Sequence, residues 1–392
     1  MVKLAQLTSR QLHSLCDLLS QPTAPFREQH VQRWISERLS AAGVPFFADA
    51  DGNIVAGVAS DGDYRRLLAS RSDQPLPLFI AHTDHPGFIG LQWTDDRHLK
   101  ARWFGGSPTK HLRGAKMWIA DDAGYWGEAV VDRHEIAKHG FGLESLTLKL
   151  TTRPRDQRRP AAKQLFGGFG FRAPVWRQGK VLYTKAADDL IGTFCALETL
   201  ISNKRAKSSP VVALFTRAEE VGFVGAIAHF EHYHLRSAKR DLLAVSLEAS
   251  RTLPGAIVGN GPIVRLGDRR TVFSPDGSQF LTRLAEKALG RHFQRRIMDG
   301  GACEGTAATA YGLRTIAMSV PLGNYHNQGF EGGPDCAKLN GPAPEFVHVD
   351  DVAGMLVLCG QVAKHAAQVA ADPWRETRAR LVKNYKSLKR FL

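Results

Sequence analysis

Histidine and carboxylate side chains stand close to the points where several apolar runs of this sequence end. In order along the chain they are His82, Asp84, Asp188, Asp189, Glu219, Glu220, Glu248 and His326. Ligands of open α/β sheets lie at the carboxyl ends of the strands, and we therefore expect side chains from these places to converge. The sequence thus predicts one site that is built from imidazoles and carboxylates.

This set of donors favours a centre for two metal ions. Nitrogen and oxygen ligands without thiolate suit zinc, cobalt or manganese, and a spare carboxylate can bridge two ions. Asp84 follows His82 by two residues. In an extended chain both side chains then point to the same face, so Asp84 can accept the second imidazole N–H and orient the ring.

The adjacent carboxylates Glu219 and Glu220 in "FTRAEEVGFVGA" need a physical explanation, because two like charges repel unless positive charge lies beside them. Two metal ions would supply that charge. We expect Glu220 to bind a metal. Glu219 is then free to act as general base, taking a proton from the attacking water and giving it to the leaving nitrogen.

Each residue also has a structural interpretation. His82 alone is compatible with a satisfied histidine of the core. Asp188 and Asp189 are good N-caps for the helix that follows them. Glu248 is harder to explain in this way, because an acid that closes "LLAVSL" would be buried at a cost unless it had a partner. The ordered combination favours the metal site.

The expected strands and helices that position these residues indicate an α/β fold. Strands are expected at 76–82, 210–216, 242–248 and 314–320, and helices at 189–202 and 277–290. The strand runs are almost wholly apolar, as expected when helices cover both faces of a sheet, whereas the helical runs carry an apolar stripe. We predict a mostly parallel, doubly covered sheet.

A stretch of short, β-rich runs interrupts this alternation. Residues 90–180 contain glycines, prolines and charges but no convincing long helix, which predicts an inserted small β-barrel-like domain. Residues 1–89 and 181–392 would then form a discontinuous catalytic domain. The run "FGGFGF" (166–171) lacks the strand and helix of a dinucleotide site, and we expect a flexible glycine loop there.

The composition narrows the class of protein. No eighteen-residue apolar run and no signal peptide is present, so we expect a cytoplasmic protein without a membrane partner. Five scattered cysteines argue against a disulfide framework or a thiolate zinc site. The formal charge is +14, densest at 153–159 and 375–390, which we interpret as solvated faces or subunit contacts rather than nucleic-acid binding. His229, His232 and His234 are expected on a helix surface.

The ordered set "HTD", "ADD", "AEEVGFVGA", "SLEAS" and "YHN" resembles the dinuclear zinc aminopeptidases, in particular the TET family of glutamyl, leucyl and deblocking aminopeptidases. The resemblance extends from about residue 10 to Val349 and includes "GNGPIVRLGD" and "MDGGACEGTA". It implies a zinc-aminopeptidase-like sheet with a β domain inserted between the first ligand and the Asp-Asp motif.

The resemblance also implies a role for each residue of the site. His82 and Glu248 would bind one metal, Glu220 and His326 the other, and Asp188 would bridge them; Glu219 would be the base and Asp84 the carboxylate that orients the histidine. It implies two divalent ions per subunit, zinc first, with cobalt or manganese possible. It further implies short peptides with a free amino terminus as substrates, and a homo-oligomer such as a tetrahedral dodecamer.

The sequence departs from this family at several points. Leu190 stands where relatives carry arginine, Glu248 where they carry aspartate, and His85 where they carry an acid. An additional stretch, 328–346, separates "YHN" from the last helix of the resemblance. We predict a metal-dependent aminopeptidase. The alternatives are a deacylase or amidase of acylated amino acids or peptides on the same scaffold, and a non-catalytic binding protein.

Overall fold

An eight-stranded sheet forms the centre of the computed structural model, which describes residues 5–72, 74–152, 159–206, 210–370 and 375–391. The strand order is β1-β2-β12-β3-β13-β16-β14-β15. These strands are β1 (Phe46–Ala48), β2 (Ile54–Ala56), β3 (Leu76–His82), β12 (Val212–Thr216), β13 (Leu242–Arg251), β14 (Ile263–Asp268), β15 (Gln294–Met298) and β16 (Arg314–Leu322). The neighbours β12, β3, β13 and β16 are parallel, whereas β2 and β14 pair antiparallel with this group. The prediction of a mostly parallel α/β sheet is confirmed.

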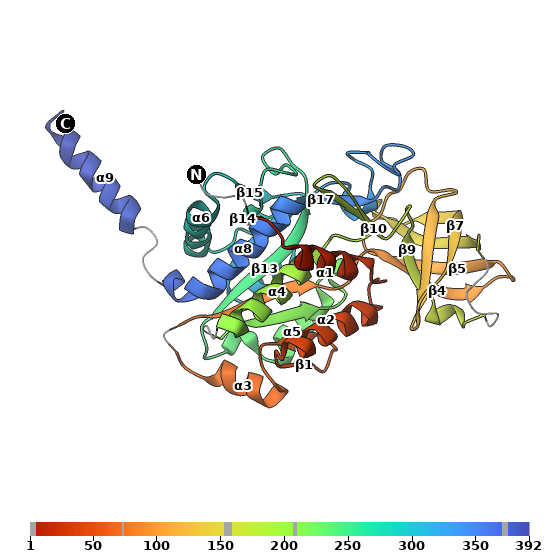
Figure 1. Ribbon diagram of the computed structural model, residues 1–392, viewed down its shortest axis with the longest axis horizontal. Helices are drawn as coiled ribbons and strands as arrows, with labels where there is room; N and C mark the ends of the chain where they lie inside the picture. Colours follow the sequence, from red (N-terminus) through yellow and green to blue (C-terminus); the bar gives the residue numbers. More distant parts are fainter. Residues whose placement is uncertain (1–4, 73, 153–158, 207–209, 371–374, 392) are drawn as a thin grey trace.

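Helices cover both faces of the sheet, as Figure 1 shows. They are α1 (Ser9–Ser20), α2 (Gln29–Ala42), α3 (Asp61–Ala69), α4 (Leu190–Ala206), α5 (Val224–His232), α6 (Pro275–Leu289), α7 (Glu304–Ala310), α8 (Val349–His365) and α9 (Arg375–Leu388). Alternate residues of β3 serve the two faces. Phe79 belongs to a core cluster with residues of α1, α2, α4, α6 and α8, and Ile80 belongs to a second cluster with residues of α3, α5 and α7. A strand that is buried on both faces has no polar side, which explains its uniformly apolar sequence.

Local signals in the sequence set the helix ends. Thr8 and Gln11 form a reciprocal capping box at the start of α1. Gly43 ends α2 in the left-handed conformation, with φ of 63°. Ser274 caps α6 and Pro275 occupies its first turn, where the missing N–H costs nothing. The expected helix 277–290 therefore forms α6, and 189–202 forms most of α4.

A closed barrel with strand order β4-β5-β8-β7-β6-β9 stands beside the sheet (Figure 1). Its strands are β4 (Gly87–Trp93), β5 (His98–Phe104), β6 (Lys116–Asp121), β7 (Gly124–Ile136), β8 (Leu143–Leu150) and β9 (Phe166–Phe169). A small antiparallel sheet of β10 (Val175–Gln178), β11 (Val181–Thr184) and β17 (Glu345–His348) follows. The expected barrel-like insertion is present.

The interpretation of "FGGFGF" as a flexible loop is wrong. Phe166–Phe169 form strand β9, which pairs with β4 and β6 and closes the barrel. A side chain at Gly167 would approach the Trp118 carbonyl oxygen within 2.0 Å, so glycine permits close contact of the two backbones. The glycines therefore serve tight packing rather than flexibility.

The structure describes the two most basic stretches of the sequence, 153–159 and 375–390, to different extents. Residues 153–158 lie outside the described residues, and Arg159 places its guanidinium 4.6 Å from the Trp93 ring centroid. Residues 375–390 contain α9, whose side chains from Arg378 onward are exposed. In the part of the chain that the structure describes, no helix has the length and apolar character needed to cross a bilayer.

Candidate metal centre

The predicted ligands meet at the carboxyl edge of the four parallel strands. His82 is the last residue of β3, and Glu248 lies near the end of β13. Glu219 and Glu220 begin a short 3-10 turn after β12, and His326 lies in another such turn after β16. Parallel strands end at one edge of a sheet, which explains how residues distant in sequence become neighbours.

Asp188 lies between the two histidines. Its Oδ1 is 3.6 Å from His82 Nε2, and its Oδ2 is 3.6 Å from His326 Nε2. His326 Nε2 is also 3.2 Å from Glu220 Oε2. Each carboxylate oxygen thus faces one imidazole, the arrangement that a residue bridging two cations requires.

Two groups of three residues have ligand atoms close enough to hold a cation, each with all atoms within 4.8 Å of one another. One group is His82, Asp188 and Glu220, and the other is His82, Glu219 and Glu248. His326 belongs to neither group. Glu219, the expected base, therefore lies within the same cluster as the expected ligands.

Several buried polar atoms of this cluster have no hydrogen-bond partner among the described residues. They are Asp188 Oδ1, Glu220 Oε1, Glu248 Oε1 and His326 Nε2, the last of which has the ion-pair contact with Glu220 but no hydrogen bond of good geometry. A buried polar atom without a partner is costly, and clustered carboxylates without a counter-charge are more costly still. Divalent cations would satisfy all four atoms, so these residues fit a metal centre.

The charges of the cluster perturb one another strongly. Burial raises the pKa of Glu219 and of Glu248 well above the ordinary value, and carboxylates nearby add to both shifts. Burial opposes protonation of His326, but Glu220 and Asp188 outweigh it and raise its pKa to about 10. For His82 the negative charge of Glu219 and Asp188 likewise exceeds the effect of burial, and its pKa is raised. The site therefore attracts positive charge.

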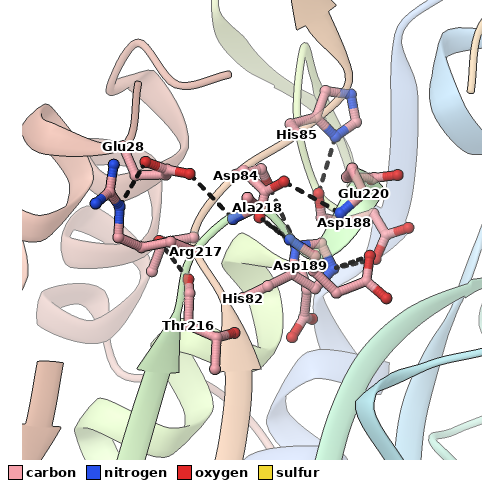
Figure 2. Close-up of polar contacts among 12 residues, drawn as sticks. Glu28, His82, Asp84, His85, Asp188, Asp189, Thr216, Arg217, Ala218 and Glu220 are labelled. Atoms are coloured by element: carbon pink, nitrogen blue, oxygen red, sulfur yellow. Dashed lines mark hydrogen bonds and ion pairs between the residues drawn. The ribbon is translucent and has the colours of Figure 1, made fainter. Parts of the chain in front are cut away.

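Asp84 organises the glutamate pair (Figure 2). Its Oδ1 accepts the backbone N–H of Glu219 at 3.0 Å, and its Oδ2 accepts that of Glu220 at 3.2 Å. His82 Nδ1 lies 3.2 Å from the Asp84 backbone carbonyl and 3.5 Å from its carboxylate. The carboxylate thus lies close enough to His82 to orient the ring, which stays a prediction, and its hydrogen bonds also fix the turn that carries Glu219 and Glu220.

Glu345 is a buried residue of this site that the sequence reasoning missed. Its Oε2 accepts the backbone N–H groups of Ala187 and Asp188 at 2.6 and 3.2 Å, and its Oε1 accepts that of His326 at 2.8 Å. One carboxylate therefore joins the two segments that carry Asp188 and His326. The available signal was an acid at the start of the buried strand β17, in the additional stretch after His326.

Other supporting residues surround the centre. His85 Nδ1 donates to the Asp188 carbonyl at 2.8 Å, and burial together with His326 lowers the pKa of His85 to about 4. Glu28 accepts the Ala218 N–H at 3.0 Å and pairs with Arg217, which holds the strand end before Glu219 (Figure 2). Neither residue had been singled out as a support.

Glu304 is a further buried carboxylate near the site, in the segment "MDGGACEGTA". It is fully buried, and burial raises its pKa to about 7. Neither of its carboxylate oxygens has a hydrogen-bond partner among the described residues. The sequence signal was again an acid in an otherwise small and apolar segment.

The two residues of the Asp-Asp motif make different contacts. Asp189 Oδ1 accepts the Gly192 N–H at 2.9 Å, as an N-cap of α4 does, whereas Asp188 faces the histidines. The peptide bond between these two residues is cis. The N-cap interpretation therefore applies to Asp189 alone.

The interpretation of the "HFEHYH" histidines needs one correction. His232 and His234 are exposed, but His229 is fully buried. It contacts Asp49 and Tyr64, and Tyr64 belongs to the core cluster that packs α3, α5 and α7 against the sheet. A surface location was wrong for His229 because its partner lies 180 residues earlier in the chain.

Comparison with known proteins gives a consistent result. The family model described as M42 glutamyl aminopeptidase matches residues 66–330. No curated protein matches the chain. The chain resembles the solved structure of the Pyrococcus horikoshii TET1 peptidase, which can assemble into a tetrahedron or a large octahedral shell, with 20% identity, a TM-score of 0.68, and coverage of 90% of this chain and 99% of that one.

Two further solved structures share the fold. An aminopeptidase from the archaeon Desulfurococcus kamchatkensis is 18% identical, with a TM-score of 0.69 and coverage of 93% of this chain and 98% of that one. An M18-family aminopeptidase from Thermotoga maritima is 15% identical, with a TM-score of 0.64 and coverage of 91% and 97%. At these identities the likeness concerns the fold.

Proposed function

Because this chain belongs to the M42 glutamyl aminopeptidase family, we propose that it removes amino-terminal residues from short peptides at a centre of two divalent metal ions. The observation that carries the proposal is the position of Asp188 between His82 and His326, surrounded by buried polar atoms without partners. A purely structural cluster would satisfy these atoms internally.

The proposed ligands are those expected from the sequence. His82 and Glu248 would hold one ion, Glu220 and His326 the other, and Asp188 both. When bound, the ions would lower the pKa of water and polarise the peptide carbonyl. Zinc suits this donor set best, and cobalt or manganese are compatible with it.

Glu219 is the proposed general base. It is buried beside His82, with Oε2 3.9 Å from the imidazole Nε2, and Asp84 fixes its backbone. In the proposed reaction Glu219 takes a proton from the attacking water and delivers it to the leaving nitrogen. A carboxylate whose pKa is raised by burial is suited to both steps, because it can hold the proton between them.

A cavity of about 20 Å³ lies next to Glu248 and has room for little more than one water molecule. Arg251, Arg265 and Tyr325 line it. The Arg251 guanidinium lies 4.0 Å from the Phe330 ring centroid, and its Nε has no hydrogen-bond partner among the described residues. Glu248 lines the same cavity and raises the pKa of Arg265, so the positive charge here balances a carboxylate of the site itself.

The test is release of free amino acid from a panel of short peptides that includes glutamyl, aspartyl, leucyl and lysyl termini. Each peptide is supplied both free and acetylated, with zinc, cobalt or manganese, and with a chelator control. Metal-dependent cleavage of the free peptides alone is the expected result. Cleavage confined to the acetylated set would favour the deacylase, and no cleavage of either set together with no bound metal would favour a binding protein.

We also propose that the chain forms a homo-oligomer. The Pyrococcus horikoshii TET1 peptidase assembles into closed shells, and the present chain covers 99% of that protein. Mass measurement in solution tests this point separately from activity.

A further inference from the structure

Helix α9 (Arg375–Leu388) carries large apolar side chains that the described residues leave about half exposed or more. Figure 1 shows it apart from both the sheet and the barrel. The exposed fractions are 60% for Leu381, 56% for Tyr385 and 51% for Leu388. Such a patch on an otherwise charged element indicates an interaction surface.

The helix is amphipathic. Leu381, Tyr385 and Leu388 follow the spacing i, i+4, i+7 and form one stripe, which we call the apolar stripe of α9. Arg380 and Lys383 lie on the opposite side of the helix, as does Lys386 one turn further along. Apolar and cationic side chains are thus separated from Arg380 to Leu388, whereas Arg378 lies on the side of the stripe, one turn before Leu381.

Positive charge is concentrated in two parts of the chain. Residues 375–390 contain seven Lys and Arg against one Glu, and residues 90–180 contain 17 Lys and Arg against nine Asp and Glu. These two excesses, of six and eight, account for the whole excess of 52 Lys and Arg over 38 Asp and Glu. The remainder of the chain has no net charge, so α9 is a local cationic element rather than part of a uniformly basic surface.

We propose that α9 docks onto an anionic lipid bilayer. The apolar stripe would enter the boundary between headgroups and acyl chains, and the lysine and arginine side chains would reach the anionic headgroups. The helix would lie along the surface without crossing it, which replaces our expectation of no membrane partner. This role is separate from the proposed peptidase activity.

A lipid surface fits α9 better than two other occupants. Two copies of α9 would bring like charges together, because each helix carries five Lys and Arg against one Glu. A nucleic acid would pair with the cationic face but would leave the apolar stripe in water. An anionic bilayer satisfies both faces at once. A helix of this length is marginal alone in water, so insertion would also stabilise it.

The experiment is co-sedimentation of the full chain with phosphatidylcholine vesicles that contain about one-third phosphatidylglycerol, against vesicles of phosphatidylcholine alone. We expect binding to the anionic vesicles only, and weaker binding at high salt. The variant R380E/K383E/K386E should reduce the partition coefficient by roughly a hundredfold. The charge-conserving variant L381S/L388S should reduce it by at least about tenfold.

A matched control reverses three exposed lysines of the barrel domain. K100E/K149E/K163E changes the net charge by the same amount, and all three side chains are exposed. This control should retain most of the vesicle binding. Equal losses in the control and in the α9 charge variant would overturn the proposal, because net charge alone would then explain binding.

Two other outcomes would also overturn the proposal. One is binding of a fluorescent DNA duplex that depends on the α9 lysines but not on Leu381 and Leu388, without binding to vesicles. The other is dissociation of an oligomer by L381S/L388S, with no vesicle binding by the unaltered chain. Peptidase activity is measured in parallel on all variants, so failure of α9 docking and failure of the proposed function are distinguishable.

Discussion

Two buried clusters of histidine and carboxylate lie on this sheet, and they differ in how their polar atoms are satisfied. In the first, His229 Nδ1 donates to Asp49 at 2.8 Å, and Nε2 contacts the Tyr64 hydroxyl at 3.1 Å. Asp49 also accepts three donors from Asp51 and Asn53. In the second, the proposed metal centre, four buried atoms lack a partner among the described residues. A closed network indicates structure, whereas an open one indicates a place for a ligand.

The histidines of the two clusters also differ in charge. Burial lowers the pKa of His229, although Asp49 opposes this, so His229 remains neutral. Burial also opposes the charged form of His82 and His326, but several carboxylates outweigh it and raise both pKa values. Both clusters contain histidines and carboxylates. The number of carboxylates near a histidine decides whether its pKa is lowered or raised.

The largest expected effect is the loss of activity on replacing Glu219, which tests its role as base separately from metal binding at the proposed centre. Glu219→Gln keeps the size of the side chain but removes the base, so we expect kcat to fall by about 100- to 10,000-fold while two metals remain bound. Steady-state kinetics and metal analysis on the same preparation measure both quantities. Glu219→Asp should recover part of the activity. Full activity of Glu219→Gln would show that the base is another residue.

The second prediction concerns a residue that acts through others. Glu345 accepts three backbone N–H groups from the segments of Asp188 and His326. In Glu345→Gln the side-chain NH₂ group would face some of these N–H groups, and two donors cannot form a hydrogen bond. We expect metal affinity to fall by about 10- to 100-fold, as for other residues that support ligands. Calorimetric titration of the chelator-treated protein with zinc measures this directly. An unchanged affinity together with lower thermal stability would assign Glu345 a structural role only.

The third prediction applies the same substitution type to both clusters. Asp49→Asn breaks a closed network, so we expect the free energy of unfolding to fall by about 1–3 kcal/mol. Glu248→Gln removes a carboxyl whose ionisation burial opposes, so in chelator we expect that free energy to rise. Urea unfolding of both variants in chelator provides the comparison. Changes of the same sign would remove the distinction between the clusters.

The sequence predicted the parts of the molecule that depend on local pattern. The apolar run 76–82 forms β3, and the stripe of 277–290 forms α6. The ends of the apolar runs also indicated where His82 and Glu248 lie, because parallel strands end at one edge of a sheet. Short elements such as α3 and α7 were missed, since a helix of seven to nine residues shows little periodicity.

What the sequence could not provide is pairing across long separations. Glu345 contacts Ala187 across 158 positions, and His229 contacts Asp49 across 180. No local pattern marks either pair. Similarly, Gly167 reads as flexible in isolation, and only the approach of Trp118 explains the need for a residue without a side chain.

The smallest expected effect is a pH dependence of stability at the structural cluster. The native pKa of His229 is lowered, so below the unfolded value of about 6.5 the unfolded chain binds a proton that the native protein does not. The stabilisation by neutral His229 is therefore complete above about pH 6.5 and is lost progressively as the pH falls below it, by at most about 1.4 kcal/mol per unit.

His229→Gln can still donate to Asp49 but does not titrate. Urea unfolding of both proteins at neutral and mildly acidic pH should show a steeper loss in the unaltered chain, and the difference cancels the titration of all other histidines. Parallel curves would mean that the pKa of His229 is not lowered on folding, and a shallower loss in the unaltered chain would mean that it is raised, as for the histidines of the metal centre.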